Sequence, residues 1–139
     1  MTQPYDVEFA SKQYQEWLVA LKGKAMLATL NQAQAMMRAV MVELRDSLSD
    51  GDALAIANAL PPLARGVMLE GWALGARKKD AETPEAFHRR LVSRLEPHQP
   101  PPDDLAAAVF AVWRDALSPE KAKAVYAHLP AALQPLWPA

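Results

Sequence analysis

The chain has 139 residues and a formal net charge of −1, which is the usual size of one domain and excludes a strongly basic or strongly acidic protein. Hydrophobic residues make up 51% of it and charged residues 22%, as in ordinary globular proteins. The absence of cysteine excludes disulfides and thiolate metal sites, and it fits a reducing cytoplasm.

The chain starts without the basic and apolar stretches of a signal peptide, and no apolar run approaches the length of a membrane span. We therefore expect a cytoplasmic protein without a membrane segment.

Apolar residues recur at helical spacing through the first half of the chain. The predicted helices cover about 6–22, about 30–48, a short stretch after Ser49, and about 62–74. In the first helix the expected buried face consists of Phe9, Tyr14, Trp17, Leu18 and Leu21. In the second, the charged residues fall on faces other than the apolar stripe: Glu43, Arg45 and Asp46.

Capping residues mark the ends of these helices. Ser49 is a predicted N-cap, and Pro61 ends the short helix because it pushes Leu60 out of the helical region. Gly75 is the expected C-terminal glycine of the helix over 62–74.

The second half of the chain shows the same helical spacing and capping residues. A charged loop at 77–82 is followed by predicted helices that begin near Thr83, Asp103 and Ser118, and by one short final helix over 130–137. The segment 97–102 contains four prolines and predicts a stiff extended link. No segment predicts a strand, so the expected fold class is all-α.

The chain contains an internal sequence repeat. A shift of 69 residues aligns 39–68 with 108–137 without a gap, and ten of the thirty positions are identical. The most specific identities are Arg45/Arg114, Asp46/Asp115, Leu48/Leu117, Ser49/Ser118, Leu60/Leu129 and Pro61/Pro130. We therefore predict two tandem four-helix modules, about 6–76 and 83–137, that pack into one domain over 1–139 around a pseudo-twofold axis and share one core.

Two motifs resemble domain-of-unknown-function family 2267 over roughly residues 8 to 138. The first is Leu60-Pro61-Pro62-Leu63-x-Arg65-Gly66-x-x-x-Glu70-Gly71-Trp72. The second combines Ala108-Val109-Phe110 and Ser118 with Leu129-Pro130-x-x-Leu133-x-x-Leu136-Trp137. The resemblance implies a bacterial, helical, duplicated protein, and it brings no established activity, cofactor or catalytic residue.

Arg65, Glu70 and Trp72 are the binding candidates, because the resemblance marks them as typical positions. A guanidinium and a carboxylate could line a ligand pocket between the modules, or make structural polar contacts instead. Gly66 and Gly71 inside the predicted helix cost stability relative to alanine, which suggests a close helix approach covered by Trp72. The four tryptophans are otherwise expected to be core anchors.

A basic stretch could attract phosphate or could simply be a solvated face. It comprises Arg77, Lys78, Lys79, Arg89 and Arg90, with Arg94 nearby. Interleaved aromatic residues and a reading helix are missing from it, so we do not expect nucleic-acid binding.

Other chemistry has little support in the sequence. Glu85-x-x-His88 is a single copy of a motif that di-iron bundles need twice, and the histidines His88, His98 and His128 have no ligand spacing. We expect no catalytic residue, metal or cofactor. The sequence favours a non-catalytic helical domain that binds a protein partner or itself, with a small-molecule or anion-binding domain near Arg65, Glu70 and Trp72 as the alternative.

Overall fold

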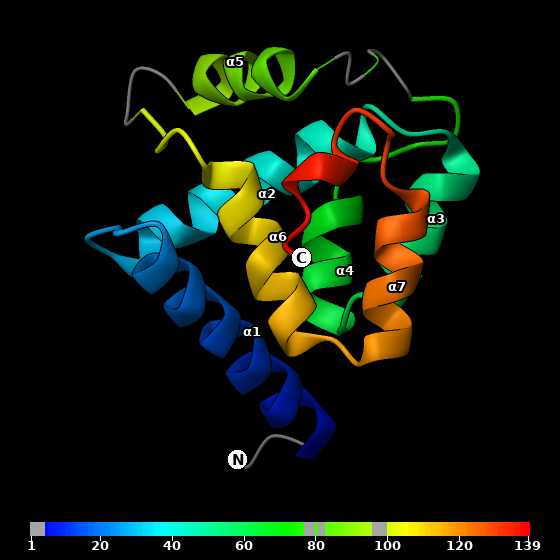
Figure 1. The fold of residues 1–139 in the computed structure, drawn as a ribbon. Helices are drawn as coiled ribbons and strands as arrows, with labels where there is room; N and C mark the ends of the chain where they lie inside the picture. The colour runs from blue at the N-terminus through cyan, green and yellow to red at the C-terminus, as the bar shows by residue number, and fades with distance from the viewer. Residues whose placement is uncertain (1–4, 77–79, 81–82, 96–99) are drawn as a thin grey trace.

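The computed structural model describes residues 5–76, 80, 83–95 and 100–139, and all regular structure in these residues is helical (Figure 1). The α-helices are α1 (Tyr5–Lys24), α2 (Leu30–Arg45), α3 (Asp50–Ala59), α4 (Pro62–Leu69), α5 (Pro84–Leu95), α6 (Leu105–Ala116) and α7 (Pro119–His128). A single 3-10 turn, η1 (Gln134–Leu136), follows. The all-α prediction is confirmed. Among the described helices, none combines the length and apolar character that a membrane span requires.

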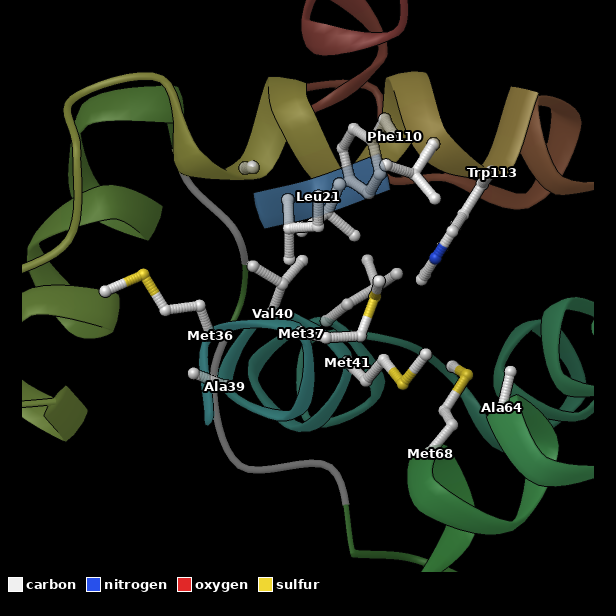
Figure 2. Packing of buried hydrophobic residues seen from close by; sticks show 14 of the residues in the cluster. Leu21, Met36, Met37, Ala39, Val40, Met41, Ala64, Met68, Phe110 and Trp113 are labelled. Carbon is white, nitrogen blue, oxygen red and sulfur yellow. The ribbon is translucent and has the colours of Figure 1, made fainter. Parts of the chain in front are cut away.

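Helix α2 lies at the centre of the fold, in contact with α1, α4, α5 and α6. Its fully buried Met37 and Met41 face Phe110 and Trp113 of α6, with Met68 of α4 beside them (Figure 2). Unbranched methionine side chains adapt to the irregular space between these three helices. One hydrophobic cluster therefore draws on helices from both halves of the chain.

The caps predicted at Ser49, Thr83 and Ser118 are present, and the Ser49 hydroxyl accepts the Asp52 N–H at the start of α3. Thr29 and Gln32 form a reciprocal capping box at the start of α2, which was not predicted. Thr83 accepts the Ala86 N–H at 3.0 Å, and a further hydroxyl at Ser118 begins α7 in the same way. These bonds satisfy backbone donors that the first turn of a helix leaves free.

Two helices end earlier than predicted. Helix α2 stops at Arg45 rather than near residue 48, and the chain turns through Ser47, whose hydroxyl donates to the Glu43 carbonyl. Helix α4 stops at Leu69 rather than near residue 74, because the backbone leaves the helical region at Glu70 and Gly71 has φ +74°. Gly75 also has a positive φ, as a turn glycine whose N–H donates to the Asp50 carboxylate.

Gly66 and Gly71 do not mark a close helix approach, so that prediction is wrong. A Cβ at either position would meet nothing within 4 Å. Gly66 lies inside α4 without a packing reason, and Gly71 serves the turn.

Residues 130–137 form a turn and η1 instead of one short α-helix, so the described second half has three α-helices and one 3-10 turn. Trp17 and Trp113 are buried as predicted, while Trp72 and Trp137 are half-buried at the edge of the core. Phe9, predicted to be buried, is 53% exposed.

Candidate functional site

Arg65 holds the end of α3. Its Nε donates to the Ala57 carbonyl at 3.1 Å, and its Nη2 donates to the Leu60 carbonyl at 3.0 Å. The last turn of a helix leaves such carbonyls without intrahelical partners, so the guanidinium supplies donors where the chain turns from α3 into α4.

Glu70 and Trp72 contact different parts of the fold. The Glu70 carboxylate accepts a hydrogen bond from Arg38 Nη1 at 2.6 Å, in an ion pair whose side chains are both largely exposed. Trp72 packs against the rim of the core. The groove described below is lined by other residues, and so are two smaller hollows, one beside Asp52 and His128 and one beside Tyr126 and Trp137. The structure therefore does not bring Arg65, Glu70 and Trp72 together around any of these three hollows.

Two of the basic residues, Arg90 and Arg94, form ion pairs with the buried carboxylate of Glu43, which the sequence analysis placed away from the apolar stripe of its helix. Arg90 Nε lies 2.8 Å from one oxygen of Glu43, and Arg94 Nη2 lies 2.9 Å from the other. Glu43 is 6% exposed, so α5 is tied to α2 by an ion triad within the fold. Arg77, Lys78 and Lys79 lie outside the described residues, and Arg89 is exposed.

Arg45 is a second charged residue that helical periodicity misplaced. It is buried, and its Nη1 donates to the Met68 carbonyl at 2.8 Å and to the Glu70 carbonyl. Its Nε lies 3.4 Å from Asp46. The spacing of apolar residues could not predict that Glu43 and Arg45 are buried, because their polar partners are distant in the sequence.

A histidine, an aspartate and a serine meet where α3 packs against α7. His128 Nδ1 lies 2.8 Å from Asp52 Oδ1, and the Ser49 hydroxyl donates to the other Asp52 oxygen at 3.0 Å. The hydrogen bond from His128 is the main reason that the pKa of Asp52 is lowered from 3.8. The aspartate lies between the other two, so the histidine is not placed to take a proton from the serine, as nucleophilic catalysis would need.

Metal-binding side chains do not gather in the described residues: no group of three or more histidine and carboxylate side chains is placed to hold an ion there. His98 lies outside these residues, and His88 is half-buried on α5. The structure therefore adds no ligand to the single Glu85-x-x-His88 motif.

A groove of about 700 Å³ runs between the outer side of α1 and the C-terminal end of α6. Its apolar lining is contributed by Tyr5, Phe9, Trp17, Ala20, Val112 and Ala116. Charged residues flank it, and Lys24 and Asp115 form an ion pair of 3.2 Å across it. The hydrogen bond from Lys24 is the largest of the causes that lower the pKa of Asp115.

Two aromatic side chains beside the groove are exposed to solvent. Tyr5 is 81% exposed, and its ring stacks on that of Phe9 with centroids 6.1 Å apart. A helical wheel separates Phe9 from the buried face, because Phe9 lies about 140° around the helix from the buried Tyr14.

The sequence profile of the family described as "Uncharacterized conserved protein (DUF2267)" matches residues 14–136. This match covers most of the chain and includes both motifs of the expected resemblance except Trp137, the last residue of the second motif. None of the curated proteins matches the chain.

Proposed function

The chain belongs to the DUF2267 family, and we propose that it is a non-catalytic protein-binding domain whose binding surface is the α1–α6 groove. The occupant is an amphipathic helix, from another protein or from a second copy of the chain. The single observation that carries the proposal is the exposed Tyr5–Phe9 pair beside the groove.

Physical chemistry supports this use of the groove. Aromatic residues are enriched at the centres of protein interfaces, where they bury a large area with few rotatable bonds. Phe9 leaves half of an apolar ring in water, and a partner that covers it would gain the hydrophobic free energy that folding leaves unused. Glu8, Lys12 and Glu16 at the rim would add charge selectivity.

The alternative, a small-molecule or anion site near Arg65, Glu70 and Trp72, has weaker support. The Arg65 guanidinium is engaged by carbonyls of the α3–α4 turn, and Glu70 is paired with Arg38. A ligand there would have to replace contacts within the chain.

Photo-cross-linking tests the groove. A photoreactive phenylalanine analogue at position 9, in cells that produce the chain, is expected to yield a protein adduct. The same analogue at Leu74, which is 76% exposed and outside the groove lining, is the matched control. The proposal would be refuted if position 9 gave no adduct, or gave no more adduct than position 74.

We also propose that the fold consists of two duplicated modules. Arg45 donates to the backbone oxygen of Glu70, and Arg114, which is 69 residues later, donates to a backbone oxygen of Ala139, which is 69 residues after Glu70. Each arginine also pairs with the aspartate that follows it. Identical side chains with equivalent long-range contacts are what a duplication would leave behind.

The helix contacts support the same proposal. Under the 69-residue shift α3 corresponds to α7, α2 to α6, and the end of α1 to α5. Helix α3 packs on α7, and the contact of α1 with α6 has its counterpart in that of α2 with α5. An experimental structure in which 39–68 does not superpose on 108–137 would refute the duplication.

We propose a cytoplasmic setting in a bacterial cell, which agrees with the lack of cysteine. Cell fractionation tests this placement, and recovery of the chain outside the cytoplasm would contradict it.

A further inference from the structure

The outer face of α1 carries a repeat that the core does not use. Exposed residues follow one another at intervals of four, three, four, three and four: Tyr5, Phe9, Lys12, Glu16, Val19 and Gly23. The buried residues Tyr14, Trp17 and Leu21 lie on the opposite side of the helix. Alternating intervals of three and four are the a and d positions of a heptad, the pattern by which two helices pack along their length.

This stripe is unusual for a surface that faces water. Val19 is 54% exposed, and with Tyr5 and Phe9 it places three large apolar side chains on one side of a 20-residue helix. The N-terminal end of α1 projects past the other helices (Figure 1). A second helix could therefore lie along it, with Val112 and Ala116 of α6 lining the flank.

The proposed function leaves the occupant open, and resting on it we propose that the occupant is a second copy of the chain, bound through an antiparallel pairing of the two α1 helices. In antiparallel pairs an a position faces a d position of the other helix. The register in which facing residue numbers add to 28 satisfies this rule along the whole stripe.

Each facing pair in this register is complementary. Phe9 faces Val19 of the second copy, so two exposed apolar side chains cover one another. Lys12 faces Glu16 of the second copy, which pairs opposite charges twice because the arrangement has twofold symmetry. The large ring of Tyr5 faces Gly23 of the second copy, where the missing side chain leaves room.

The parallel arrangement is disfavoured by charge. It would place Lys12 against Lys12 and Glu16 against Glu16, because equivalent positions face one another in a parallel pair. The first turn of α1 is acidic, with Asp6 and Glu8, and the last turn is basic, with Lys22 and Lys24. Antiparallel helices bring these unlike ends, and unlike ends of the helix dipoles, together.

Sedimentation equilibrium tests the dimer. The purified full chain is expected to approach twice its mass of 15.3 kDa as its concentration rises. In K12E both charge pairs become pairs of carboxylates, so the dissociation constant should rise roughly tenfold or more. The charge-swapped variant K12E/E16K should restore association, and K121E on the exposed face of α7 should leave it unchanged.

Disulfide trapping tests the register in a chain that lacks native cysteine. A mixture of F9C and V19C chains is expected to form a disulfide between the two variants, and neither variant alone should do so. A disulfide-linked dimer formed by F9C alone, or by V19C alone, would overturn the antiparallel register.

A monomer at every concentration would overturn the dimer. If position 9 still cross-linked to a different protein in cells, the protein-binding function would stand while the self-pairing failed, so the two proposals can fail separately.

Discussion

At the scale of single residues, charged side chains are buried only where opposite or polar partners meet them. Glu43 receives two guanidinium groups from α5, whereas Glu70 makes one exposed pair with Arg38. The two carboxylates therefore differ greatly in how much they should contribute to stability, although both form ion pairs.

We expect E43Q to lower the free energy of unfolding by about 2 kcal/mol, since it leaves two arginines without their buried counter-charge. The value is below that of a fully buried pair because the Arg94 side chain is 41% exposed. The midpoint of urea unfolding measures it. E70Q is the matched control and should cost less than about 0.5 kcal/mol; equal effects of the two substitutions would contradict the burial argument.

The Asp52–His128 contact predicts a pH dependence. The folded state lowers the pKa of the Asp52 carboxyl below 3.8, mainly through the hydrogen bond from His128. The carboxylate therefore contributes stability above the unfolded pKa, and this contribution disappears as the pH falls through the folded pKa. In H128A, carbon-detected NMR titration should show the pKa of Asp52 moving up towards 3.8.

Asp115 provides the internal control for this titration. Its pKa is lowered by Lys24 and Arg114, so H128A should leave it in place. An unchanged Asp52 pKa in H128A would mean that His128 is not the cause of the shift.

At the scale of elements, the turn after α4 depends on backbone conformation more than on packing. Both glycines near this helix end have open space around a hypothetical Cβ, but only Gly71 has a positive φ. The same substitution should therefore have opposite effects at positions 66 and 71.

We expect G71A to destabilise the fold by about 1 kcal/mol or more, because alanine is strained at φ +74°. G66A should stabilise it by about 1 kcal/mol, because alanine restricts the unfolded chain and suits the interior of α4. Thermal unfolding of the two variants beside the parent chain measures both. A loss of stability in G66A would mean that the space beside Gly66 is needed.

At the scale of the whole molecule, the two halves of the chain share their core. Met37 and Met41 of the first half pack beside Phe110 and Trp113 of the second (Figure 2). Neither half can keep these side chains from water alone.

We expect a fragment of residues 1–76 to lack cooperative thermal unfolding, because it would expose the apolar side of α2. Circular dichroism of the fragment measures this, and addition of a fragment of residues 83–139 should restore helical signal. A sharp, independent transition of fragment 1–76 would show that the first half folds by itself.

The sequence by itself determined the helices and where most of them start, because apolar spacing and the caps at Ser49, Thr83 and Ser118 act within a few residues. The tertiary structure decided which charged side chains are buried and which aromatic side chain stays exposed to solvent. Glu43 is buried by Arg94, 51 residues away, and Phe9 is exposed because none of the described helices covers that side of α1. Local patterns report a residue's neighbours along the chain, whereas burial depends on which distant elements come to lie against it.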